Sequence, residues 1–349
     1  MGDKTDSGLF QLKVFFAFFA AVFFVFVLKE LRQIFIPFFI ALFFYFMLNN
    51  TVHKLMVLKI PKAIIMIGLL LVIFICLFLI GLLIFTGASS FIENFPAYSE
   101  KITQLAKGML ASLKLPLIDV EHYIAKIDWG KTFDPEQITA LVSGTMGNFV
   151  SFIGNLLLVL ILLMFMLGEK VPMVTRVARA LARERGEELQ AIVAAIDSRV
   201  QHYLFIKTLM SVITAALAVL ILLLGRVDFV IFSALLIFFL NYIPTIGSLL
   251  GTAFPVLIAF LRYGFCLRLV LITAALMVMG FIMGNVVEPQ VMGKNLDLSP
   301  IVIVLCMIFW GWLWGMVGLF LAVPVTSALK IIFESIPALK PLAAAMSGE

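Results

Sequence analysis

Charge is what this sequence has least of. Only 13% of its 349 residues are charged and 63% are hydrophobic, whereas a soluble protein is about a quarter charged and about half apolar. This composition excludes an ordinary soluble protein and predicts an all-α polytopic membrane protein. The net charge of +5 therefore fits basic loops retained on the cytoplasmic side better than it fits a nucleic-acid partner.

Signatures of enzymes and metal sites are also missing. The three cysteines lie in apolar runs without a CxxC pair, which excludes a disulfide framework or a zinc site. There is no HExxH or GxSxG pattern, and the string nearest to a phosphate-binding loop has Ala125 where the first glycine belongs. We therefore expect no enzyme, no cofactor and no metal, and active transport would have to draw on an ion gradient.

What the sequence does contain is apolar segments of about the 20 residues that a membrane span needs. About six are expected to be full spans: 10–28, 34–48, 63–86, 149–167, 204–224 and 267–287. Polar stretches divide them into an N-terminal part (1–87), a small helical extracytoplasmic insert (88–148), a fourth span with a basic interfacial helix (149–203) and a transport core (204–340). The basic loops predict a cytoplasmic N-terminus and an external insert.

Two further apolar segments are interrupted, 229–261 at residues 241–247 and 301–332 around residues 311–315. Each half is too short or too interrupted for one simple span. Paired interrupted segments are the best sequence indication of a transporter binding site, because bare backbone cannot face lipid and must line a cavity or lie within protein. One full span separates them, so re-entrant hairpins here would form an inverted repeat. Two pairs of ordinary short helices with glycine packing are the alternative.

Polar residues at these interruptions are the candidate binding residues. Proline frees a carbonyl and glycine lets backbone approach a ligand. The candidates for substrate or ion binding are Asn241, Pro244, Thr245, Gly247, Glu288, Pro289 and Pro324. Glu288 directly follows a span, where a carboxylate is costly; it could bind a cation, carry a proton, pair with Lys294 or simply lie at the interface.

Two local patterns near the second interruption have structural interpretations. Ser299 followed by Pro300 is typical of a helix start. Trp310, Trp312 and Trp314 are expected to anchor the membrane interface, with one wall of a cavity as the alternative.

Three motifs together resemble one known family. They are Asn-Tyr-Ile-Pro-Thr-Ile-Gly at 241–247, Glu-Pro-Gln-Val-Met-Gly-Lys at 288–294 with Leu-Ser-Pro at 298–300, and Gly-Leu-Phe-Leu-Ala-Val-Pro at 318–324. As a set they are similar to the autoinducer-2 exporters, or PerM-like permeases, of bacteria. The resemblance implies a homopentamer in the cytoplasmic membrane whose re-entrant hairpins move in an elevator-like step.

The family resemblance leaves the cargo open, because members are described both as exporters of autoinducer-2 and as sodium(lithium)/proton antiporters. The neutral polar residues of the first interruption favour export of a small polar solute. Glu288 keeps the antiporter alternative open, and a non-transporting scaffold whose insert binds a partner is the third hypothesis. The expected partners are a small solute or cation and the lipid bilayer, without nucleic acid.

Overall fold

The computed structural model describes residues 15–16, 19–20, 22–112, 135–168, 186–244, 246–292 and 298–348. In these residues nearly all of the backbone is helical and no strand occurs. Its first long helices are α2 (Arg32–Val57), α3 (Lys62–Ser112), α6 (Pro135–Gly168) and α8 (Gly186–Leu224). The prediction of an all-α protein is confirmed.

Among the described residues, six helices are long and apolar enough to cross a membrane. They are Arg32–Val57, Lys62–Phe91, Ser151–Gly168, Ala194–Leu224, Leu267–Met292 and Met316–Ser335. The Lys62–Phe91 stretch has a mean hydropathy of 3.4 and is only 11% buried, so its apolar side chains face outward, as they do against lipid. The chain is therefore a polytopic membrane protein. Within the predicted span 10–28, residues 15–16, 19–20 and 22–28 are helical, and the others lie outside the described residues.

The chain divides into two compact units. The first consists of Met1–Thr51, Leu158–Val200 and Leu296–Glu349, and the second of Val52–Leu157 and Gln201–Asn295. One interrupted segment belongs to each unit. The division into four consecutive regions stays a prediction.

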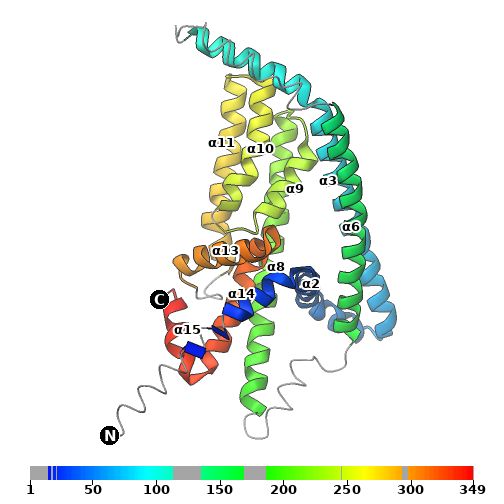
Figure 1. The fold of residues 1–349 in the computed structure, drawn as a ribbon, viewed down its shortest axis with the longest axis vertical. Coiled ribbons are helices and arrows are strands. Elements are labelled where there is room, and N and C mark those ends of the chain that lie inside the picture. Colours follow the sequence, from blue (N-terminus) through cyan, green and yellow to red (C-terminus); the bar gives the residue numbers. More distant parts are fainter. Residues whose placement is uncertain are drawn as a thin grey trace. The chain divides into compact units, whose positions relative to one another are not determined.

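In the second unit, the first interrupted segment forms a helical hairpin, here called the first hairpin. It pairs α9 (Val230–Leu240) with α10 (Ile246–Tyr263), and α10 also packs against α11 (Leu267–Ile282); Figure 1 shows the three side by side. The 11 residues of α9 extend about 16 Å, whereas the hydrocarbon core of a bilayer is about 30 Å thick. Thus α9 is too short to span a membrane.

A glycine fixes the joint of the first hairpin. A Cβ on Gly247 would lie 1.8 Å from the carbonyl oxygen of Leu240, so only glycine lets the two helices meet this closely. The described part of the break covers residues 241–244 and α10 begins at Ile246, which places Gly247 in the first turn of α10 rather than in the break itself.

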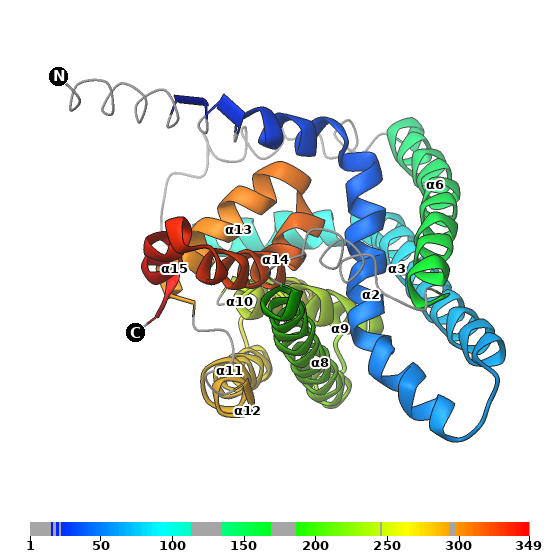
Figure 2. The same cartoon turned by 90° about the horizontal axis from the view of Figure 1, so that it is seen from below.

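In the first unit, the second hairpin joins α13 (Pro300–Trp314) to α14 (Met316–Ser335) through Gly315, whose φ is 63°. As predicted, α13 begins at Pro300 with Ser299 as its cap residue. A short 3-10 helix, η2 (Pro337–Leu339), and α15 (Lys340–Met346) complete the chain, and Figure 2 shows α15 beside α14. With 20 residues and a mean hydropathy of 2.0, α14 is long and apolar enough to span, so the expectation that each half of this segment is short or interrupted is wrong for α14.

The tryptophans of α13 do not form one interfacial group. Trp310 and Trp314 are buried, and the indole N–H of Trp314 donates to the carbonyl of Leu28 at 3.1 Å. Trp312 is 58% exposed, with the ammonium group of Lys29 4.3 Å from its ring centroid. The anchor expectation is therefore wrong for the two buried rings, whose indole groups hold the core of this unit.

The insert between the third and fourth spans is partly described. Helix α3 continues without interruption beyond its apolar stretch to Ser112, and α6 begins at Pro135. A proline at the first helical position loses no intrahelical hydrogen bond, which explains why α6 begins there. Residues 113–134 of the insert and residues 169–185 of the basic segment 169–201 lie outside the described residues.

Candidate functional site

A buried polar stripe runs along α8, in a part of the helix long and apolar enough to span a membrane. Lys207, Ser211 and Thr214 are 2%, 0% and 3% exposed. Their spacing of four and three residues places them on one face of the helix. Charged and polar side chains within a span are costly unless they face the protein interior and find partners, so this stripe marks α8 as more than a lipid-facing helix.

Lys207 forms an ion pair with Glu288 at the start of α12 (Glu288–Met292). Its side chain is 3% exposed and that of Glu288 is 14% exposed. Removing two charges from water costs several kcal/mol per ion, and a buried pair recovers this only with good geometry. A buried ion pair is therefore weak evidence for a purely stabilising role. Its other effect is to hold the Glu288 side chain against α8.

A π-helix, η1 (Met283–Val287), separates α11 from Glu288. Pro289 supplies a physical cause, because a proline ring clashes with the carbonyl four residues earlier in an α-helix, here that of Asn285. The wider π-turn relieves this clash, and the Asn285 amide donates to the carbonyl of Phe281 at 3.2 Å. Single π-turns within helices are frequent at functional sites, and this one sets the side from which Glu288 meets Lys207.

The first break also contacts α8. Asn241 is buried and its side-chain amide donates to the Ser211 hydroxyl at 3.0 Å. The Tyr242 hydroxyl donates to the Thr208 hydroxyl at 2.7 Å. The break is thus held by side-chain hydrogen bonds to a neighbouring helix as well as by its own backbone.

Together these contacts define a polar cluster: Lys207, Thr208 and Ser211 of α8, Asn241 and Tyr242 of the first break, and Glu288 of α12. It offers amide and hydroxyl donors, hydroxyl acceptors, one ammonium group and one carboxylate. A polar molecule that enters can exchange its own hydrogen bonds for those between the break and α8.

Of the predicted site residues, Asn241 and Glu288 both contact α8. Their partners, Ser211 and Lys207, lie one helical turn apart. Pro244 is half-buried in the break, Pro289 is exposed beside Glu288, and Gly247 packs against backbone. Pro324 is buried inside α14 of the other unit. Thr245 and Lys294 lie outside the described residues, and the partner of Glu288 described here is Lys207.

The α8 residues of the cluster were missed by the sequence interpretation, which treated 204–224 as a plain span. The signal was present: Lys207 is a charged residue inside an apolar segment, followed by Ser211 and Thr214 at helical spacing. A charged residue within a span indicates function by default.

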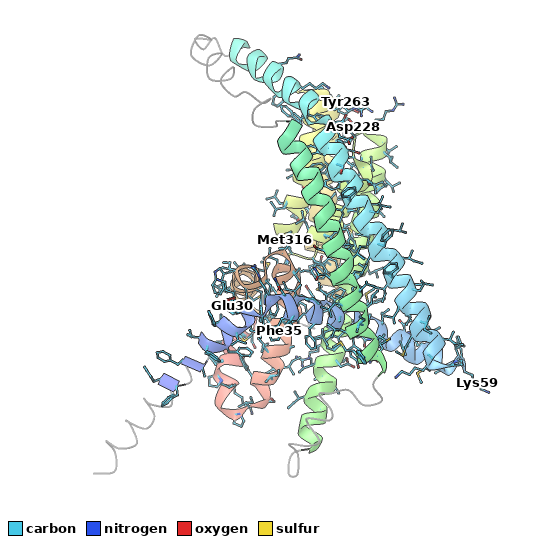
Figure 3. The ribbon with its side chains drawn as sticks, turned by 45° about the vertical axis from the view of Figure 1, so that its right-hand side comes forward. Glu30, Phe35, Lys59, Asp228, Tyr263 and Met316 are labelled. Carbon is cyan, nitrogen blue, oxygen red and sulfur yellow. The ribbon has the colours of Figure 1, made fainter. Side chains whose placement is uncertain are left out.

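A second charged cluster lies at the α8–α9 turn and the α10–α11 turn. Arg262 pairs with Asp228, and the Tyr263 hydroxyl donates to the carbonyls of Gly225 and Arg226 at 3.0 and 2.7 Å. Burial raises the pKa of the Tyr98 phenol, and the nearby Asp228 carboxylate raises it further, so Tyr98 stays neutral here. Figure 3 shows Asp228 beside Tyr263, far from Lys59 at the other end of the unit.

Comparison with known proteins finds similarity to transporters. The sequence matches the family described as AI-2E family transporter over residues 14–338. It is 32% identical over 292 residues to the AI-2 transport protein TqsA of Escherichia coli K12, covering 82% of this chain and 81% of that protein. It is 34% identical over 268 residues to a provisionally named transport protein of Haemophilus influenzae, covering 74% of each.

Proposed function

Because the chain belongs to the AI-2E transporter family, a family of transporters and not of enzymes, we propose that it exports a small polar organic solute related to autoinducer-2. The observation that carries this proposal is the buried polar cluster at the break of the first hairpin. Its hydrogen bonds from Asn241 to Ser211 and from Tyr242 to Thr208 both join neutral groups. Such groups suit an uncharged ligand rich in hydroxyl and carbonyl groups. The similarity to TqsA, named as an AI-2 transport protein, supports the choice of solute.

In this proposal the solute binds where the first break meets α8, and its donors and acceptors replace those that now join the two. The exchange leaves no buried polar group unpaired, which matters because each unpaired group costs about 1–3 kcal/mol. Lys207 and Glu288 hold the adjacent turn of α8 against α12. Thr245, Pro244 and Pro324 remain candidate binding residues, and Gly247 acts through the close approach of α9 and α10.

The test is efflux of labelled autoinducer-2 from cells that lack other exporters of this family. Expression of the wild-type chain is expected to lower the retained label, and Asn241→Ala and Ser211→Ala are expected to reduce efflux about tenfold or more, since each removes a partner at the break. Asn94→Ala is the matched control, because Asn94 is exposed and its amide bonds within its own helix. Equal retention with and without the wild-type chain would reject this solute.

Cation/proton antiport is a second candidate function, and the buried pair of Lys207 and Glu288 is the observation that favours it. A cation that binds the Glu288 carboxylate would displace the Lys207 ammonium group, which could then release a proton. Vesicles with an imposed proton or sodium gradient test this exchange. Glu288→Gln should abolish it, and ion exchange that persists in this variant would exclude Glu288 as the carrier.

The arrangement in the membrane belongs to the same proposal. The shortness of α9 supports a re-entrant first hairpin, and the basic loops support a cytoplasmic N-terminus with the insert outside. The family resemblance alone supports a homopentamer and an elevator-like step of the hairpins. The mass of the purified assembly and the labelling of single cysteines from either side of the membrane test these parts.

A further inference from the structure

A groove with a volume of about 330 Å³ lies between the C-terminal half of α8 and α11. Its lining is entirely apolar: Leu217, Leu220, Ile221, Leu224, Ala275, Val278, Met279, Ile282 and Met283. Both walls are open to the surroundings, because Leu220 and Val278 are 57% and 56% exposed. In a membrane protein the surroundings of such a groove are acyl chains.

One end of the groove meets the charged cluster of the α8–α9 and α10–α11 turns. A Cβ on Gly225, which follows the groove residue Leu224, would lie 3.0 Å from the Ile272 side chain of α11, and Arg268 lies one turn before Ile272. The guanidinium group of Arg268 stands 4.7 Å from the ring centroid of Tyr263, and the Tyr263 hydroxyl bonds to the carbonyl of Arg226. The backbone of Arg226 and the guanidinium group of Arg268 thus contact the same tyrosine at this end of the groove.

The charge at this mouth is unbalanced. The two turns carry Arg226, Arg262 and Arg268 against Asp228, which leaves a net charge of +2. Asp228 is paired with Arg262, and within the described part of the chain neither Arg226 nor Arg268 has a carboxylate partner. Both are exposed, beside strongly exposed apolar side chains such as Phe265 and Leu267. In the proposed orientation this end of the unit faces the outside of the cell. The enrichment of basic residues in cytoplasmic loops therefore does not explain its arginines.

We propose that the groove holds one acyl chain of an anionic phospholipid, whose phosphate binds the guanidinium groups of Arg226 and Arg268. Guanidinium groups bind phosphate through paired, charge-assisted hydrogen bonds, and basic groups between transmembrane helices are a recurrent headgroup site. The apolar walls accept the chain along about 10 Å of helix, from Leu224 to Leu217. The Tyr263 ring orients Arg268 for the phosphate.

Native mass spectrometry of the full-length protein tests the proposal with phosphatidylglycerol and phosphatidylcholine of the same acyl composition. Retention of phosphatidylglycerol is expected to exceed that of phosphatidylcholine about tenfold. The variant Arg226→Gln/Arg268→Gln should lose this preference. Lys54→Gln/Lys59→Gln removes two exposed charges elsewhere in the same unit and should keep it.

A second pair of variants tests the groove independently of charge. Ala275→Trp fills it and should lower phosphatidylglycerol retention to the level of phosphatidylcholine, whereas Ala274→Trp, also exposed on α11 but outside the lining, should not. Equal retention of both lipids by the wild type overturns the proposal. So does a preference that survives both the arginine and the Ala275 variants, or a change in assembly mass on Ala275→Trp with lipid retention unaltered, which would assign the groove to a second copy of the chain.

Discussion

The polar side chains of the two hairpins reach in different directions. In the first hairpin, Asn241 and Tyr242 leave the break and bond to α8. In the second hairpin, the indole N–H of Trp310 donates to the Thr326 hydroxyl at 3.0 Å and so joins α13 to α14. A ligand that competes for the first set of bonds loosens the break from a neighbouring helix, whereas one that competed for the second would open the hairpin itself. This contrast teaches that similar joints can have different roles, and it supports the proposal that the ligand binds at the first hairpin.

The joints themselves are alike, and breaking them is expected to have the largest effect. A Cβ on Gly247 would lie 1.8 Å from the Leu240 carbonyl oxygen, and one on Gly318 would lie 1.8 Å from that of Trp310. Gly247→Ala and Gly318→Ala should each lower the free energy of unfolding by about 4 kcal/mol or more, since backbone cannot move aside. Thermal unfolding of the purified protein measures this.

The control for the glycine variants is Gly284→Ala, whose Cβ would meet nothing within 4 Å. A small effect of Gly318→Ala beside a large effect of Gly247→Ala would show that the two joints are not equivalent.

The second difference between the two hairpins is the buried ion pair of Lys207 and Glu288, which lies beside the first hairpin. Lys207→Met leaves a largely buried carboxylate alone and should cost about 3–5 kcal/mol. The double variant Lys207→Met/Glu288→Met replaces both charges with apolar groups and should recover most of this loss, while transport stays impaired. Denaturation combined with a transport assay separates the two quantities; a double variant no more stable than Lys207→Met would contradict the pairing.

The hydrogen bonds of Trp310 and Tyr242 predict opposite effects on stability and on transport for two milder substitutions. Thr326→Val leaves the buried Trp310 N–H without its partner and should cost about 1–3 kcal/mol of stability, with transport per folded molecule unchanged. Tyr242→Phe should cost only about 1 kcal/mol, because the Thr208 hydroxyl also donates to the Leu204 carbonyl, yet it should slow transport. If Thr326→Val slowed transport and Tyr242→Phe did not, the ligand would belong to the second hairpin.

The smallest effect is expected at the ion pair of Arg262 and Asp228, whose side chains are 38% and 41% exposed. Exposed pairs contribute about 0–1 kcal/mol and are screened by salt, so Asp228→Asn should change the melting temperature little. A loss as large as that of Lys207→Met would show that this turn is as important to the fold as the first break.

Much of this architecture could be predicted from the sequence, because apolar length and interruption are local properties. The interruptions predicted at 241–247 and around 311–315 contain the observed breaks at 241–244 and at Gly315, although residues 311–314 are helical. The helix starts at Pro135 and Pro300 likewise follow from proline and polar residues. The pair of Lys207 with Glu288 could not be predicted in the same way. These residues are 81 positions apart, and no local pattern brings them together.

The π-helix also has a consequence for the length of the chain in this segment. An α-helix turns by about 100° per residue, and the i→i+5 pattern of residues 283–287 accommodates one residue more than an α-helical turn. If the same residues formed a regular α-helix, Glu288 would turn away from α8 by about that angle, whereas deleting one residue from this turn would restore a regular helix with Glu288 on the same side. The side on which Glu288 lies therefore depends on the π-turn and on the number of residues before it together.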